Sequence, residues 1–214
     1  MKKAFLLMII GSVGFSSAPG ATARDDYLIS SYGLSSSDHS IPSGSTPIVD
    51  GVIKADEWAD AAFAFIDVEK GWRIKVFYKR DASSLFFAFS GLMNNGKERY
   101  PEIMIDAKCD RTGEWNGDDW WLHISYNDCE GKGRYNIWKC TPTKPGWTAN
   151  NFPIPEPGII EAQVSYEKLG IALDTTREIG LAFNVTDTRS AYDFWPASAR
   201  LKNPSSWAAV RLSN

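Results

Sequence analysis

The residues best suited to chemistry cluster around one strand-like segment, residues 119–127, which reads DWWLHISYN. Successive side chains of a β-strand point to opposite faces of the sheet. One face would carry Trp120, Leu122, Ile124 and Tyr126, and the other Trp121, His123, Ser125 and Asn127. Because Leu122 and Ile124 belong in the core, we expect Trp121 and His123 to be exposed on the opposite face.

A second strand, 134–140, follows the glycine-rich sequence EGKG at 130–133. A tight turn centred near Gly131–Lys132 would place Trp138 opposite Ser125 and Asn136 opposite Asn127. The predicted patch then consists of Trp121, His123, Ser125, Asn136 and Trp138.

Outward polar residues also occur on two other predicted strands. In 102–107 the apolar Ile103 and Ile105 point inward, which leaves Glu102, Met104 and Asp106 outward. In 159–166 the outward set is Glu161, Gln163 and Ser165. Indoles, amides, an imidazole and a carboxylate on one face suit a carbohydrate, whose C–H faces stack on indole and whose hydroxyls need donors and acceptors. Alternatively, this face packs against the N-terminal leader or a neighbouring sheet.

Acidic residues crowd one end of the same strands. The predicted metal ligands are Asp106, Asp110, Asp118 and Asp119, with Asp128 and Glu130 nearby. Carboxylate oxygens are the ligands that Ca²⁺ prefers, and structural calcium would explain the crowding. Asp side chains that cap turns are the alternative.

Other chemistries have weaker support. Glu102 and Glu161 supply the two acids of a glycoside hydrolase only if both face one cleft. His123 is the only histidine inside the predicted domain, and no nucleophile motif of the G-x-S-x-G type occurs, so a catalytic triad is not expected. The net charge of −3 argues against nucleic-acid binding. We expect no enzyme activity.

The element pattern predicts a single all-β domain. Short apolar runs separated by Gly, Asn, Asp and Pro predict an antiparallel β-sandwich of the immunoglobulin or jelly-roll kind. The predicted strands are 63–68, 73–79, 85–91, 102–107, 119–127, 134–140, 159–166, 179–187 and 206–212, with very short helical turns near 55–62 and 166–171.

The N-terminal region predicts export. Residues 1–23 combine two lysines, a short apolar run and an A-x-A pattern, which is typical of a signal peptide, and the run is too short for a membrane span. We therefore expect a secreted or periplasmic protein with a Ser- and Gly-rich leader at 24–46, partly docked as an edge segment, and a domain at 47–214. Of the three cysteines, Cys129 and Cys140 flank one predicted strand and are the first choice for a disulfide, with a Cys109 pairing as the alternative.

The order of several segments resembles carbohydrate-binding modules of family 9 and the wider DOMON-like sandwich group. These segments are PIVDGVIKADEW (47–58), IKVFYKRDASSLFFAFSGL (74–92), PEIMID (101–106), DDWWLHISY (118–126), IIEAQVSYEKLGI (159–171), EIGLAFNVTD (178–187) and NPSSWAAVRL (203–212). The resemblance implies a non-catalytic module that binds a polysaccharide or oligosaccharide on one sheet face, often with structural calcium, and that can serve a partner glycoside hydrolase. Because some DOMON-like domains bind haem, it also leaves open an electron-transfer domain with His123 and Met104 as axial ligands.

The resemblance also implies roles for individual residues. Glu102 falls at the acidic ligand-contact position, His123 where the family commonly has arginine, and Ser125 where it has a polar amide. The two tryptophans that usually wall the binding cleft are not at their expected places. Tyr100 is the only aromatic near the first, and Trp195 lies several residues before the second.

Overall fold

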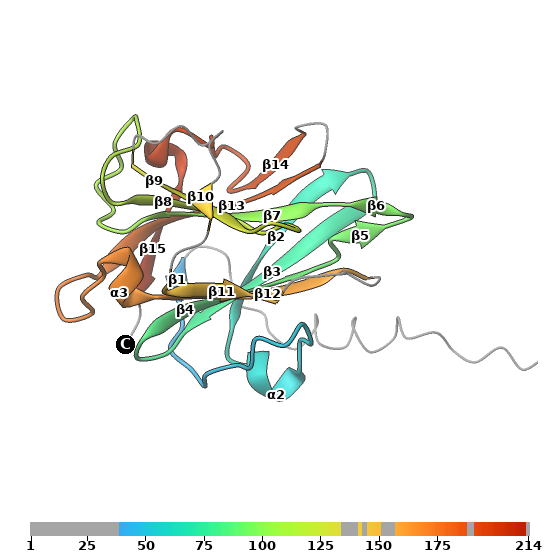
Figure 1. Cartoon of the computed structure of the whole chain (residues 1–214), viewed down its shortest axis with the longest axis horizontal. Coiled ribbons are helices and arrows are strands. Elements are labelled where there is room, and N and C mark those ends of the chain that lie inside the picture. The colour runs from blue at the N-terminus through green and yellow to red at the C-terminus, as the bar shows by residue number, and fades with distance from the viewer. Residues whose placement is uncertain (1–38, 134–140, 143–144, 151–156, 188–190, 213–214) are drawn as a thin grey trace, which may run out of the picture. The chain divides into compact units, whose positions relative to one another are not determined.

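The computed structural model describes residues 39–133, 141–142, 145–150, 157–187 and 191–212. These residues form two stacked β-sheets with very short helices (Figure 1). This confirms the predicted fold class, a single β-sandwich.

The first layer is an eight-stranded sheet. Its order is β1 (Ser40–Ile41), β15 (Ala208–Leu212), β13 (Glu178–Thr186), β7 (Tyr100–Asp106), β8 (Asp119–His123), β9 (Cys129–Lys132) and β10 (Thr141–Pro142), while β14 (Tyr192–Trp195) also pairs with β13. The β1–β15 pair is parallel, and the other pairs are antiparallel.

The second layer is a five-stranded sheet. Its order is β11 (Trp147–Ala149), β12 (Ile159–Ser165), β4 (Ser84–Ser90), β3 (Trp72–Arg80) and β2 (Ala62–Glu69). The remaining elements are the hairpin β5 (Met93–Asn94) and β6 (Lys97–Glu98), the helices α2 (Ala55–Trp58) and α3 (Tyr166–Leu169), and the 3₁₀ turn η1 (Pro204–Ser206).

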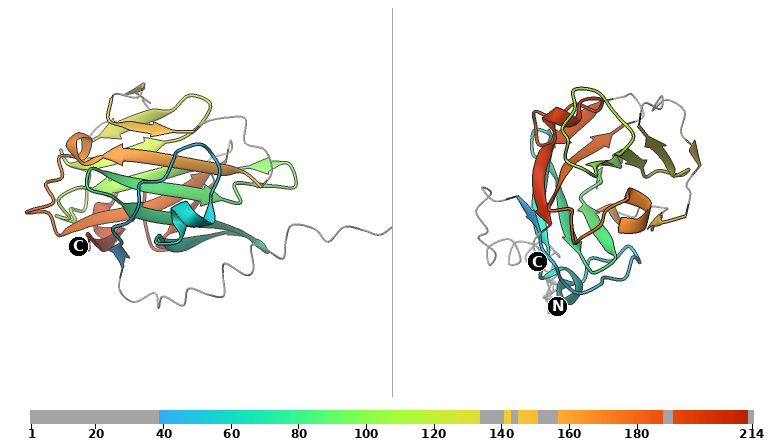
Figure 2. Two further views of the ribbon diagram at one scale, coloured as in Figure 1. Left: turned by 90° about the horizontal axis from the view of Figure 1, so that it is seen from below. Right: turned by 90° about the vertical axis from the view of Figure 1, so that its left-hand side faces the viewer.

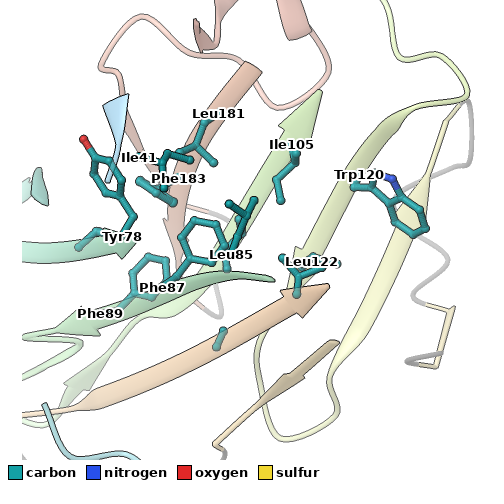
Figure 3. Packing of buried hydrophobic residues seen from close by; sticks show 14 of the residues in the cluster. Ile41, Tyr78, Leu85, Phe87, Phe89, Ile105, Trp120, Leu122, Leu181 and Phe183 are labelled. Atoms are coloured by element: carbon teal, nitrogen blue, oxygen red, sulfur yellow. The ribbon is translucent and has the colours of Figure 1, made fainter. Parts of the chain in front are cut away.

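Alternating apolar side chains of both sheets form the core between the layers. Phe183 of β13 packs edge-to-face on Phe87 and Phe89 of β4, at ring-centroid distances of 5.6 and 5.7 Å (Figure 3). Trp120 and Leu122 lie in the same core, as the alternation predicted (Figure 3). Burying an aromatic or aliphatic side chain of this size stabilises a fold by about 1.5–3 kcal/mol.

The segment before β2 covers the outer face of the five-stranded sheet, and α2 lies across that face (Figures 1 and 2). Trp58 packs there on Phe86 and Ala88, and its Nε1 donates to Glu161 Oε1 at 2.8 Å. The indole therefore covers part of the outer face of this sheet.

The end of the predicted leader belongs to the folded unit. Ser40 and Ile41 pair with Arg211 and Leu212, and Ile41 is fully buried. The predicted signal peptide and the strand predicted at 134–140 lie outside the described residues. Within the described ranges, no helix has the length and apolar character needed to cross a membrane.

Candidate functional site

The strand register aligns four side chains on the outer face of the eight-stranded sheet. These side chains, called the Glu102 row below, are Phe194 of β14, Asn184 of β13, Glu102 of β7 and His123 of β8. They face away from the core because their sequence neighbours Phe183, Ile103 and Leu122 point into it. Since paired strands lie about 4.8 Å apart, the row spans about 14 Å.

Aromatic side chains lie beside this row. A parallel line of side chains lies two residues further along the strands on the same outer face. It consists of Tyr192, Thr186 and Tyr100. Tyr192 stacks on Phe194 at a ring-centroid distance of 6.3 Å and an interplanar angle of 22°. Tyr100 lies 6.3 Å from the ring of Tyr126, which is 63% exposed. An aromatic pair therefore lies toward each end of the Glu102 row.

Hydrogen bonds fix the polar centre of the row. Glu102 is buried, and its Oε1 lies 2.9 Å from His123 Nδ1, while its Oε2 accepts from Asn184 Nδ2. This contact leaves Nε2 as the imidazole nitrogen available to a ligand, and the His123 side chain is 17% exposed. Asn184 Oδ1 is buried without a hydrogen-bond partner within the described residues. The row therefore offers hydrogen-bonding groups held in place by one carboxylate.

A polar pocket of about 380 Å³ adjoins Tyr100. Its lining residues are Glu69, Gly96, Lys97, Glu98, Arg99, Tyr100 and Asp187. Tyr100 donates its hydroxyl to Glu98 at 2.9 Å, and burial together with this bond raises the pKa of Tyr100 to about 12. Arg99 is buried, and its charge lies 3.5 Å from Glu69 and 3.7 Å from Asp187.

The prediction that Trp121 is exposed is wrong, because its side chain is only 5% exposed. The alternation does place Trp121 outside the sandwich core, but a second apolar cluster covers it there. That cluster contains Met104, Trp115, Trp121, Cys129, Ala182, Ala199 and Trp207. The loop 107–118 and the segment 196–207 bring the covering residues over the sheet. The rings of Trp121 and His123 stack at a centroid distance of 5.4 Å and an interplanar angle of 27°, so the indole helps to fix the orientation of the imidazole.

The predicted register of the next hairpin is also wrong. Residues 129–132 are strand β9, in which Gly131 pairs with Trp121 and Cys129 with His123. The chain reverses at 124–128 instead, so Tyr126 lies in the turn and not in the core. Ser125 also lies in this turn, where its N–H donates to Asp128 Oδ1 at 3.0 Å. Asn136 and Trp138 lie outside the described residues.

Trp195 lies on the inner side of β14. Its register partner is Phe183, on which it stacks at 5.4 Å, and Tyr78 approaches it at 6.1 Å. The same alternation that turns Phe194 outward turns Trp195 toward the core. The aromatic residues that this strand presents to the outer face are therefore Tyr192 and Phe194.

Sequence reasoning missed Asn184, Phe194, Tyr192 and the exposure of Tyr126. The outward direction of Asn184 could have been predicted from the sequence, because the apolar Leu181, Phe183 and Val185 alternate with it in a predicted strand. The strand at 192–195 had no such signal, since four residues before a proline show too little periodicity.

Three of the predicted metal ligands come together at the far end of the same sheet face. Carboxylate oxygens of Asp106, Asp110 and Asp118 lie within 4.8 Å of one another and can hold a metal ion. Asp119 pairs with Asp106 across β7 and β8, and its Oδ1 is buried without a partner in the described part of the chain. A Cβ on Gly180 would lie 2.8 Å from Asp106 Cβ, so the glycine makes room for this carboxylate.

These carboxylates are also loop caps. Asp106 accepts from the N–H of Arg111 at 2.9 Å, and Asp119 Oδ2 accepts from the N–H of Asn116 at 2.6 Å. Burial and the neighbouring carboxylates raise the pKa of Asp106, against the lowering effect of these backbone hydrogen bonds. Burial likewise raises the pKa of Asp119 to about 7. A cation would relieve both the desolvation and the mutual repulsion.

Asp128 and Glu130 have other partners. Asp128 caps the turn before β9, and Glu130 lies 2.8 Å from Lys168 Nζ. The acidic residues that lie close together in the sequence therefore occupy three separate places. Asp106, Asp110 and Asp118 form the loop cluster, Asp128 caps a turn, and Glu130 belongs to a buried ion pair.

The geometry does not support the two alternative chemistries. Glu102 lies on the outer face of the eight-stranded sheet, whereas Glu161 lies on the outer face of the five-stranded sheet beneath Trp58. The two acids therefore do not face one cleft. Met104 is fully buried in the Trp121 cluster and His123 is bonded to Glu102, so they do not jointly line an open apolar pocket.

The thiol positions leave the disulfide a prediction. Cys109 is a free thiol, so the alternative pairing through Cys109 is wrong, and burial raises the pKa of this thiol to about 11. Cys140 lies outside the described residues, so the Cys129–Cys140 pairing is not tested.

Two of the solved structures that are similar to this chain are sugar complexes. One is a carbohydrate-binding module of family 9 from Caldicellulosiruptor kristjanssonii in complex with cellotriose, with a TM-score of 0.56 and 16% identity over 82% of this chain and 93% of that chain. The other is a family 9 module from the same organism in complex with glucose, with a TM-score of 0.55 and 17% identity over 81% and 94%. No protein-family model matches the chain, and no curated protein matches it significantly in sequence. The chain therefore has the β-sandwich fold seen in carbohydrate-binding modules of family 9.

Proposed function

We propose that the protein is an exported, non-catalytic module that binds a glycan across the Glu102 row. The observation that carries the proposal is the alignment of Phe194, Asn184, Glu102 and His123 on one outer sheet face, flanked by aromatic pairs. The family 9 modules of the same fold, bound to cellotriose and glucose, support this ligand class.

Each group of the row has a part in holding a sugar. The rings of Phe194 and Tyr192 offer apolar faces to pyranose C–H groups, and Tyr126 offers another at the opposite side. His123, whose side chain is partly exposed, can form a hydrogen bond with a sugar hydroxyl through Nε2, while the buried Asn184 holds Glu102 in place. Glu102 orients both side chains.

The site has no arrangement for bond cleavage, because the row contains one carboxylate, and both of its oxygens are engaged by neighbouring side chains. A shallow outer face leaves much of the ligand solvated, so we expect modest affinity. The biological role is that of a targeting module for a polysaccharide or for a partner glycoside hydrolase.

The proposal extends to the surroundings of the site. The signal-like segment 1–23 supports secretion or a periplasmic location, where a Cys129–Cys140 disulfide is stable. Asp106, Asp110 and Asp118, with Asp119 beside them, are the residues that would hold a structural calcium ion. Calcium would neutralise the repulsion of these carboxylates and so fix the loop 107–118.

The test is calorimetric titration with cellotriose, supported by pull-down on a polysaccharide panel. We expect Phe194→Ala to weaken binding roughly fivefold to tenfold through loss of one stacking contact. The matched control is Phe65→Ala, which removes a half-buried phenyl ring from the outer face of the five-stranded sheet. Equal affinities of Phe194→Ala, His123→Ala and wild type would show that the glycan binds elsewhere.

A further inference from the structure

The loop 107–118 joins the neighbouring strands β7 and β8 at one end of the sheet. It leaves β7 after Asp106 and enters β8 at Asp119, and these two residues are register partners. The acidic cluster lies at the base of the loop, and Trp115 lies within it. A single loop therefore contributes both to a cation site and to the cover over Trp121.

The acidic cluster has features that a set of surface carboxylates lacks. Asp106 and Asp119 are completely buried, and Asp119 Oδ1 has no hydrogen-bond partner in the described ranges. Asp110 and Asp118 bring further carboxylates to Asp106 from the loop itself. A divalent cation held by Asp106, Asp110 and Asp118 would offset the repulsion among these charges and that of the neighbouring Asp119.

Aromatic contacts continue from this loop to the Glu102 row. A Cβ on Gly131 would lie 3.5 Å from the Trp121 ring and 3.7 Å from the Trp115 ring, so both indoles pack over the same glycine. Trp121 stacks on His123, and His123 bonds to Glu102. Trp115 thus supports the side chain that positions the imidazole.

The loop 107–118 also contacts the segment 196–207, which covers the rest of the Trp121 cluster. Trp115 Nε1 donates to Leu201 O at 2.9 Å, and its ring lies 6.2 Å from the Trp207 ring at 82°. Arg111 Nη2 donates to Ser205 O at 2.8 Å. A change in the position of the loop must therefore disturb the packing above Trp121.

We propose that a divalent cation bound at Asp106, Asp110 and Asp118, beside Asp119, controls glycan affinity, with Trp115 as the positioning residue that links the loop to His123. This coupling rests on the proposed glycan function of the Glu102 row. Without the cation, repulsion among the carboxylates loosens the loop, the indole of Trp115 leaves Gly131, and the support beneath His123 weakens. The orientation of Nε2 toward a ligand is then lost.

The direct test is the NMR signal of the His123 ring during titration of the chelator-treated protein with Ca²⁺. The chain contains two histidines, so His39→Gln assigns the ring spectrum. We expect Ca²⁺ to shift the His123 signal, and Asp110→Asn, at an exposed position, to abolish the shift. Trp115→Phe should still bind Ca²⁺ by calorimetry but show a smaller shift, and Trp115→Ala a smaller one still.

The glycan arm measures cellotriose affinity with Ca²⁺ and with chelator. We expect chelation to weaken binding about fivefold or more, and less in Trp115→Phe. No Ca²⁺ binding, or binding that leaves the His123 signal unmoved, overturns the coupling. Equal cellotriose affinity in both buffers also overturns it while the proposed function stands. If Ca²⁺ shifts the His123 signal but cellotriose never binds, the link between loop and row holds and the proposed ligand is wrong.

Discussion

At the scale of single residues, the buried charges are the least predictable feature of the chain. Glu130 reads as part of a glycine-rich turn, yet its carboxylate lies inside the sandwich, 2.8 Å from Lys168 Nζ and 2.7 Å from Trp147 Nε1. Lys168 belongs to α3, Trp147 to the five-stranded sheet, and Glu130 to the eight-stranded sheet. The cluster thus ties both layers together through residues that are far apart in sequence.

Lys168→Ala should destabilise the fold by about 3–5 kcal/mol, because it removes the cation from a buried carboxylate. The midpoint of urea unfolding measures the effect. Arg73→Ala is the control, since its ion pair with Asp67 is 57% and 73% exposed on the two sides and should contribute less than about 1 kcal/mol. Equal midpoints for both variants would show that the buried pair contributes no more than an exposed one.

At the scale of elements, periodicity located most strands but not the hairpin that frames the site. The run 85–91 is β4 within one residue, and 179–187 is β13 within one residue. EGKG resembles a turn because glycine favours turns. Gly131 is instead a strand residue that packs against the rings of Trp115 and Trp121. Sequence alone does not distinguish a glycine in a turn from a glycine in a strand that packs against aromatic rings.

The short strand β1 should contribute strongly to stability although it lies in a Ser- and Gly-rich leader. Ile41 is 0% exposed in the core, so Ile41→Ala should cost about 2–4 kcal/mol through lost burial and a cavity. Ile48→Ala removes the same atoms at a position that is 61% exposed and should leave the unfolding free energy nearly unchanged. Thermal and urea unfolding of both variants distinguish a docked β1 from a dispensable one.

At the scale of the whole molecule, alternation predicted which side of a sheet each residue faces but not what covers that side. Ile103, Ile105, Leu122 and Ile124 point inward as predicted. The outward residues Met104 and Trp121 are nevertheless buried, because the loop 107–118 and the segment 196–207 fold over them. Burial by segments that are distant in the sequence does not change the hydrophobic periodicity of the strand itself. The sequence therefore predicted the sheet face on which Glu102 and His123 lie, but not which aromatic side chains are exposed on that face.

The acidic cluster should make stability depend on pH and on divalent cations. The folded-state pKa of Asp119 is about 7, above the ordinary value of 3.8, so the folded state binds more protons between these values. In chelator, wild type should therefore lose stability relative to Asp119→Asn as the pH rises from about 4 to about 7. Ca²⁺ should restore it most at the upper end of this range. Urea unfolding at several pH values tests this expectation, and a pH-independent difference between the two proteins contradicts it.

The strand β14 hydrogen-bonds to β13 alone among the described strands, yet it presents Tyr192 and Phe194 outward and Trp195 inward. Under the proposed glycan function, the ligand contacts and the interior packing fall at alternate positions of this one strand. Changing residues 192 and 194 together would then alter the proposed sugar contacts and leave the inward Trp195 in place. This makes β14 a natural place to graft new recognition onto the scaffold.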